Sequence, residues 1–296
     1  MTVVEIVYWI SLGVLVWVFF GYPLFMIGLS RLAGKKQAAP APAELPAVSV
    51  LICAYNEETV IGERIRNALA LDYPPDKLKI VLVSDGSSDR TNDIARSFSD
   101  PRYTIITYSE RGGKAKALNT GMEHLTGEIV VLTDANVMFE PDAVRKLVAR
   151  FDSPEVGGVV GNVVLRSPDG SLAGEGVYSR YEKAVHTAEA ELATMITVDG
   201  AMYALRREFV CPIPADSITD DWYLASGALA AGKKLVWGPD AIGYEAAAES
   251  VAGEFRRKVR MIAGGYQTMF RRAGVFLNPP GHPVIFGVIA RRAKPD

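Results

Sequence analysis

The sequence predicts an α/β protein in which helices cover both faces of a mostly parallel sheet. Apolar, strand-like runs alternate with helix-like segments after residue 48, as they do where right-handed crossovers build a parallel sheet. A long apolar stretch precedes this alternation and a basic amphipathic stretch follows it. We therefore expect one transmembrane helix before the sheet and an amphipathic interface helix after it.

The N-terminal unit, residues 1–36, is expected to cross a membrane once. Its apolar part, 6–30, is longer than the ~20 residues that span a bilayer. The basic residues follow the apolar run, whereas a signal peptide would place them before it: Arg31, Lys35 and Lys36. The positive-inside rule then puts the N-terminus outside and the rest of the chain in the cytoplasm, as for a protein of the bacterial inner membrane. Pro23 is a potential kink.

An Ala/Pro-rich linker, 37–47, leads to the expected catalytic domain, 48–250. In its first half, alternation and helical spacing predict strands over 48–54, 79–83, 103–108, 128–132 and 156–165, with helices over 58–71, 89–98, 113–125 and 141–151. The second half is less regular, with helices expected over 172–192 and 220–231 and strands over 198–205, 234–237 and 241–244. The last unit, 251–296, contains a basic amphipathic helix, 254–272, for which a solvated surface helix is the alternative.

Composition excludes several classes of function. The 296-residue chain has a formal net charge of -2, so no basic field predicts a nucleic-acid partner. Its two cysteines build no disulfide framework or zinc site, and its three histidines lack metal-ligand spacing.

Polar residues at the ends of the apolar runs are the candidates for a donor site. Glu57 follows the first strand, where an acid can bond a ribose hydroxyl. Asp85 follows the second, although turn capping explains many such acids. Lys114 follows Gly112 and Gly113 at a helix start, a position that suits phosphate oxygens.

Two further acidic motifs predict metal binding and proton transfer. Asp134 and Asn136 present oxygen atoms at the end of a strand, which favours Mg²⁺ or Mn²⁺ bridged to phosphates. Asp220 and Asp221 begin a helix, where they either complement its dipole or supply a general base. Transfer from a sugar diphosphate needs one such base, because metal and arginines stabilise the leaving group.

Taken in order, the motifs resemble the family 2 glycosyltransferases with a GT-A fold, the membrane-anchored inverting group that includes cellulose, chitin and hyaluronan synthases. The resemblance covers roughly residues 48–272. The matching segments are Ala54-Tyr55-Asn56-Glu57, Asp85, Gly112-Gly113-Lys114, Ala117-Leu118-Asn119, Asp134, Val198-Asp199-Gly200-Ala201 and Asp220-Asp221-x-x-Leu224.

This resemblance implies a role for each site residue. The implied nucleotide-binding residues are Ala54, Tyr55, Glu57, Asp85, Lys114 and Asp134, and the implied metal ligands are Asp134 and Asn136. Asp221 is the implied catalytic base, with Asp220 beside it, and the acceptor is expected at Asp199, Gly200 and Trp222. Processive members carry Gln-x-x-Arg-Trp where this chain has Arg257-x-x-Arg260-Met261. Arg257 and Arg260 are thus the expected diphosphate clamp, and polymer synthesis is not implied.

We therefore expect a membrane-anchored inverting glycosyltransferase that moves a sugar from a nucleoside diphosphate, with UDP favoured, to a saccharide or lipid-linked acceptor. Two alternatives stay open. A nucleotidyltransferase on a similar fold should lack the Asp220-Asp221 pair and the two arginines. A non-catalytic, membrane-anchored subunit would bind sugar nucleotide without turnover.

Overall fold

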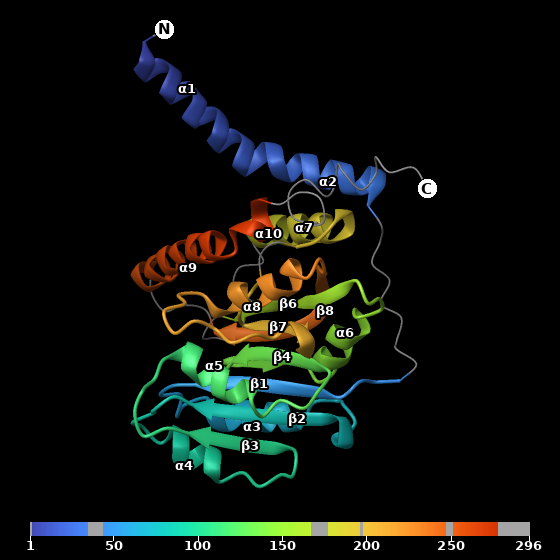
Figure 1. Ribbon diagram of the computed structural model, residues 1–296, viewed down its shortest axis with the longest axis vertical. Helices are drawn as coiled ribbons and strands as arrows, with labels where there is room; N and C mark the ends of the chain where they lie inside the picture. The colour runs from blue at the N-terminus through green and yellow to red at the C-terminus, as the bar shows by residue number, and fades with distance from the viewer. Residues whose placement is uncertain (1, 35–43, 167–176, 196–197, 247–250, 278–296) are drawn as a thin grey trace.

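A computed structural model describes residues 2–34, 44–166, 177–195, 198–246 and 251–277 (Figure 1). The expected linker at 37–43, the first residues of the helix expected over 172–192, and the tail at 278–296 lie outside the described residues. The eight strands of the sheet are β1 (Val48–Ala54), β2 (Leu78–Ser84), β3 (Tyr103–Thr107), β4 (Ile129–Asp134), β5 (Val137–Phe139), β6 (Val156–Arg166), β7 (Met202–Arg206) and β8 (Lys234–Ala246).

The strand order is β3-β2-β1-β4-β7-β6-β8-β5. The four strands from β3 to β4 pair in parallel, and β6 pairs in parallel with β8. Antiparallel pairing occurs where β7 lies between β4 and β6, and where β5 closes the edge on β8. The expected α/β fold with a mostly parallel sheet is confirmed.

Helices cover both faces of the sheet, each over its own apolar core. One face carries α3 (Ile61–Leu69), α4 (Thr91–Arg96) and α6 (Ala143–Ala149), and the other carries α5 (Lys114–Met122) and α8 (Asp220–Ala230). Ile61, Ile65 and Ala68 explain the position of α3, because their helical spacing places all three on the buried face.

Two expectations for the second half are wrong in detail. The strands expected over 234–237 and 241–244 form one strand, β8, which continues through an irregularity opposite Gly161 and Asn162. There the Asn162 side chain donates to the Pro239 carbonyl at 2.9 Å, so pairing resumes after the break. The strand expected over 198–205 begins at Met202, because Asp199 holds a turn by accepting the Ala201 N–H at 3.1 Å.

The N-terminal apolar segment bends and docks onto the domain. It consists of α1 (Val3–Val16), a π-helical turn η1 (Trp17–Gly21) and α2 (Tyr22–Ala33). Pro23 lacks an N–H, so it leaves the Phe19 carbonyl without its helical donor. The Tyr181 hydroxyl of α7 (Val177–Leu192) donates to that carbonyl at 2.7 Å. In Figure 1, α1 projects from the molecule and α2 lies along α7.

Residues Val3–Leu32 are long and apolar enough to cross a membrane. Polar contacts nevertheless hold α2 to the domain: the Tyr22 hydroxyl donates to Glu189 at 2.6 Å, and Ser30 donates to Glu191. The exposed apolar surface therefore runs without interruption only along α1 and η1, while α2 has one docked face and one exposed face.

The basic amphipathic segment forms α9 (Val251–Arg271), followed by the short α10 (Ala273–Leu277). Its apolar face is exposed at Phe255, Ile262 and Phe270. Its small residues pack across the start of α8, because a Cβ added at Gly264 would clash with the Thr219 side chain. This packing brings the basic helix beside the acidic start of α8.

Candidate active site

The expected donor residues gather at one edge of the sheet. In the strand register, Cys53 of β1 lies opposite Asp134 of β4, and Ala54 lies opposite Ser84 of β2. These strands are parallel, so the residues that follow Ala54 and Ser84 leave the sheet on the same side as Asp134.

Asp85 anchors the glycine loop. Its side chain is buried, and its two carboxylate oxygens accept the backbone N–H groups of Gly112 and Gly113, each at 2.7 Å. Gly113 has φ +88°, in the left-handed region that favours glycine. The next residue, Lys114, begins α5. Asp85 thus fixes the loop that places Lys114 over the sheet edge.

Lys114 links three elements that are far apart in sequence. Its Nζ lies 2.8 Å from Asp134 Oδ1 on β4 and 3.2 Å from Asp220 Oδ2 on α8. Surrounding protein atoms lower the pKa of the ammonium, but the charges of Asp134 and Asp220 outweigh that effect and raise it. Its side chain remains 42% exposed, so it is accessible at this carboxyl edge of the sheet, the region called the crevice below.

Asp221 is a buried carboxyl group with a strongly raised pKa. Burial raises its pKa to about 7, and the neighbouring Asp220 charge contributes in the same direction. The Trp222 N–H donates to its Oδ1 at 2.7 Å, which partly opposes the shift. A Cβ added at Gly200 would lie 2.5 Å from Asp221 Oδ2, so only glycine lets this backbone approach the carboxylate so closely. The structure therefore places two expected acceptor residues, Gly200 and Trp222, against the expected base.

The two expected clamp arginines lie in different surroundings. Arg257 approaches Glu245 Oε1 at 3.9 Å, whereas Arg260 is solvent-exposed further along α9. The Asn136 amide donates to the same Glu245 oxygen at 3.2 Å. Burial raises the pKa of Glu245, whose side chain is 12% exposed. Sequence reasoning missed Glu245, since nothing local marks one acid in a strand as a partner of two distant residues.

Arg64 is a second residue that sequence reasoning missed. This α3 arginine is fully buried, its guanidinium stacks on the Phe139 ring at 4.6 Å, and its Nη1 donates to Asn67 at 2.8 Å. Its Nε and Nη2 have no hydrogen-bond partner in the described parts of the chain. Burial lowers the pKa of Arg64 to about 9, and the Asp134 charge opposes that shift. The sequence did contain a signal for it: position 64 falls on the same helix face as the apolar residues 61, 65 and 68, so a charged residue there is expected to be buried.

The remaining donor candidates lie at the rim. The Arg111 guanidinium stacks over the Tyr55 ring at 4.0 Å. Burial raises the pKa of Glu57, and the charges of Asp134 and Asp89 raise it further. Glu57 is therefore close enough to Asp134 for their charges to repel.

The oxygen groups present fit a metal that shares its ligands with a diphosphate. Among the described residues, no three His, Cys, Asp or Glu side chains form a metal-binding group. Asp134 is one carboxylate, with the Asn136 amide two residues away, and Mg²⁺ is commonly held by one or two carboxylates together with substrate phosphates and water. A protein cage is therefore not required here.

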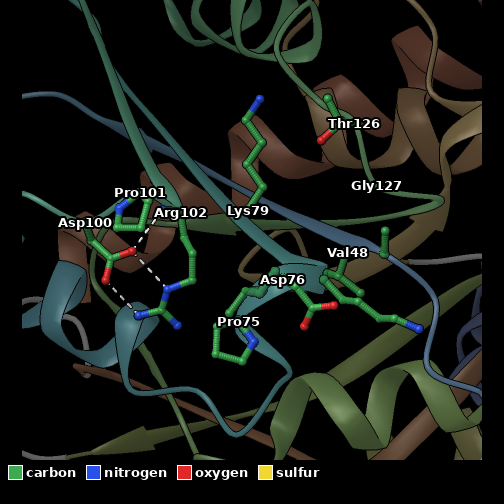
Figure 2. Close-up of a pocket in the computed structure, with 12 residues that line it drawn as sticks. Val48, Pro75, Asp76, Lys79, Asp100, Pro101, Arg102, Thr126 and Gly127 are labelled. Carbon is green, nitrogen blue, oxygen red and sulfur yellow. Dashed lines mark hydrogen bonds and ion pairs between the residues drawn. The ribbon is translucent and has the colours of Figure 1, made fainter.

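A separate hollow lies at the opposite, amino ends of the strands. It has a volume of about 820 Å³, and Figure 2 shows Lys79 in it beside the Asp100–Arg102 ion pair, whose atoms are 2.9 Å apart. None of the expected site residues lines it.

Comparison with known proteins identifies the family. Residues 49–209 match the family model described as glycosyl transferase family 2, over more than half of the chain. The chain belongs to glycosyl transferase family 2. This family 2 chain is 28% identical to the probable glycosyltransferase YdaM of Bacillus subtilis, covering 94% of the chain and 70% of that protein. It is 25% identical to poly-beta-1,6-N-acetyl-D-glucosamine synthase of Staphylococcus aureus, covering 77% of the chain but only 57% of the synthase.

Solved structures agree with this assignment. The family 2 chain matches the mannosyltransferase PcManGT from Pyrobaculum calidifontis, in complex with GDP-Man and Mn²⁺, with a TM-score of 0.71 and 27% identity over 96% of the chain and 86% of that protein. It matches Staphylococcus aureus TarS 1-349, in complex with UDP-GlcNAc, with a TM-score of 0.55 and 18% identity over 69% of the chain and 59% of that structure, a likeness of fold. The expected GT-A-type fold is confirmed.

Proposed function

We propose that this protein is a membrane-anchored inverting glycosyltransferase that moves a sugar from a nucleoside diphosphate to an acceptor hydroxyl. One arrangement carries the proposal: a carboxyl group with a pKa near 7, Asp221, lies against Gly200 and beside Asp220, which Lys114 connects to Asp134. A proton acceptor and a phosphate-binding cation are thus held in one crevice.

In the proposed reaction, Asp221 accepts the proton of the acceptor hydroxyl as the oxygen attacks the anomeric carbon. The bond between that carbon and the diphosphate oxygen breaks, and the nucleoside diphosphate leaves with the electron pair. Lys114 and the two α9 arginines stabilise the negative charge that develops on the diphosphate. A Mg²⁺ or Mn²⁺ ion held by Asp134, with Asn136 near it, would supply further charge neutralisation.

The residues suggest how the donor is oriented. Tyr55, stacked under Arg111, offers a planar platform at the crevice rim. Glu57 is positioned for a ribose hydroxyl. Asp85 acts on the donor through the glycine loop it anchors. We favour UDP as the nucleotide, and the likeness to a structure that holds GDP-Man makes GDP the competing choice.

A donor screen tests this proposal. The purified full-length protein is incubated with UDP- and GDP-sugars and with Mg²⁺, Mn²⁺ or a chelator, and released nucleoside diphosphate is measured. Metal-dependent release from one donor supports the proposal. Binding without release would favour the non-catalytic subunit, and release of pyrophosphate from a nucleoside triphosphate and a sugar phosphate would favour a nucleotidyltransferase.

We propose further that α1 and η1 together cross the membrane, since α1 alone is too short to span it, and that the catalytic domain lies in the cytoplasm. Two surfaces support this proposal: the uninterrupted exposed apolar surface of α1 and the exposed apolar face of α9. In addition, the first basic residue of the chain, Arg31, follows the span. Protease added outside sealed, right-side-out vesicles should leave the catalytic domain intact. Its digestion there would reverse the topology.

A further inference from the structure

A cavity of about 340 Å³ lies in the seam between α2 and α7, and its lining mixes charge with apolar surface. The polar residues are Ser30 and Arg31 from α2 and Lys183, Thr187 and Glu191 from α7. The apolar wall includes Ile27 and Trp237. None of these residues belongs to the proposed active site.

The seam lies beside the exposed apolar face of α2. One face of α2 packs on α7 through Tyr22, Met26 and Ser30. The other face leaves Leu24, Phe25 and Leu32 exposed, by 69%, 51% and 89%. A helix with one face on protein and one apolar face outward, directly continuous with an apolar span, is suited to the headgroup boundary of a bilayer.

The charges of the cavity leave one positive charge unbalanced. Glu191 accepts the Ser30 hydroxyl, whereas neither Arg31 nor Lys183 forms an ion pair within the described residues. By residue type, two basic side chains and one acidic side chain line the cavity, a formal net charge of +1. That charge complements a phosphodiester, which carries a single negative charge.

A buried donor in the same wall also lacks a partner. Trp237 is 6% exposed, and its indole Nε1 has no hydrogen-bond partner in the described parts of the molecule. Its ring packs edge-on against His186 at 5.2 Å, which fixes the indole beside the cavity.

We propose that this cavity binds the headgroup of an anionic phospholipid, with the phosphodiester between Arg31 and Lys183 and the acyl chains toward Ile27 and the exposed face of α2. This inference rests on the proposed attachment to a membrane and is independent of the proposed chemistry. The bound lipid would join α2 to α7 and so fix the domain against the bilayer surface.

Short-chain lipid binding tests the proposal. The full-length protein in a neutral detergent is titrated with dihexanoyl phosphatidylglycerol, and its melting temperature is followed. We expect saturable stabilisation. In the variant Arg31→Gln/Lys183→Gln the apparent affinity should fall roughly 30-fold, since each basic side chain at a lipid surface contributes ~5-fold. Trp237→Phe, which removes the indole N–H and part of the apolar wall but no charge, should weaken binding less.

A matched control is Arg66→Gln/Lys79→Gln, which removes two cations remote from the seam and should bind the lipid like the unaltered protein. Equal stabilisation by inorganic phosphate or glycerol 3-phosphate would make this a free-phosphate site and overturn the lipid assignment. Equal effects of dihexanoyl phosphatidylcholine, or an undiminished response of the double variant, would overturn it as well.

Nucleoside diphosphate binding, measured in the same samples, separates the two proposals. If it is retained while the lipid has no saturable effect, the lipid site is wrong and the proposed chemistry stands. If the unaltered protein binds the lipid but does not bind nucleoside diphosphate, the proposed chemistry is wrong and the lipid site stands.

Discussion

Asp85 and Asp221 are the same residue type at the two sides of one crevice, but their surroundings differ. Two backbone N–H groups at 2.7 Å satisfy the carboxylate of Asp85, so its charge stabilises the loop it holds. Asp221 is packed beside Asp220 and receives one backbone N–H, and its pKa rises to about 7. A carboxylate that accepts several hydrogen bonds is stabilised in its charged form and can anchor a loop. A buried carboxylate beside a second negative charge has a raised pKa and is suited to accepting a proton.

Asp221→Asn should give the largest effect. Transfer to acceptor should fall by at least ~10²-fold, because general-base catalysis is lost, while donor binding changes little. In the unaltered protein the transfer rate should rise as pH increases through about 7, since the base acts only when ionised. The exposed Asp93→Asn variant is the control. Near-normal turnover by Asp221→Asn would move the role to Asp220.

Asp134→Ala should weaken metal-dependent nucleotide binding by about 10²-fold, because a bound metal contributes several kcal/mol of charge stabilisation. Calorimetric titration of the nucleoside diphosphate with and without Mn²⁺ measures this. Asn136→Ala, whose amide already bonds Glu245, should lose less. If Asp134→Ala keeps its metal-dependent affinity, Asp134 is only a turn residue that pairs with Lys114.

Asp85→Asn makes the same change as Asp221→Asn but should destabilise the protein. One carboxylate oxygen becomes an NH₂ group that faces an N–H, and loss of a charged hydrogen bond costs about 1.5–3 kcal/mol. A fall in melting temperature of a few degrees is expected in thermal unfolding. An unchanged melting temperature would mean that the loop does not depend on this anchor.

Arg260→Ala should weaken nucleoside diphosphate binding by about tenfold in detergent, where no anionic lipid is present, because one charge-assisted contact is lost. Arg256→Ala, offset around α9, should change it less. Normal binding by both variants, together with loss of membrane attachment, would make α9 an anchor and remove the clamp from the site.

The smallest effect is a stability change that depends on pH. The raised pKa of Asp221 means that its ionisation costs native stability as pH rises from about 4, where the unfolded group titrates, to about 7. Above pH 7, Asp221→Asn should therefore be more stable than the unaltered protein by on the order of 1–2 kcal/mol after screening, and near pH 4 the difference should vanish. Destabilisation at pH 8 would contradict the contrast with Asp85.

Local pattern predicted the first half of the sheet well. The strands expected over 48–54, 79–83, 103–108 and 128–132 match β1 to β4 to within two residues. Continuous apolar runs suit β1, β2 and β4, which are buried on both faces, whereas β3 is a partly exposed edge strand. The three-residue β5 is too short to give a signal. The sequence predicted two strands in place of β8, because the irregularity within β8 interrupts the apolar pattern. The continuity of β8 is visible only in its pairing with β6 on both sides of the irregularity.

The sequence also predicted that several acids would lie at one edge of the sheet, but it could not show which residues they contact. Lys114 was expected to contact phosphate, and the structure adds its contacts to Asp134 and Asp220. The contacts of Arg64 with Phe139, and of Glu245 with Asn136 and Arg257, join residues far apart in sequence, so no local pattern could predict them. The roles of the individual site residues stay predictions until the variants are measured.

The bend at the π-helical turn has a practical consequence for preparing the protein. Residues before Tyr22 make few of the contacts that hold the N-terminal segment to the domain, whereas α2 covers α7 through Met26, Glu189 and Glu191. A truncation that starts at Tyr22 should keep this cover and give a folded, less detergent-dependent protein. One that starts at residue 44 would uncover the α7 surface and should aggregate.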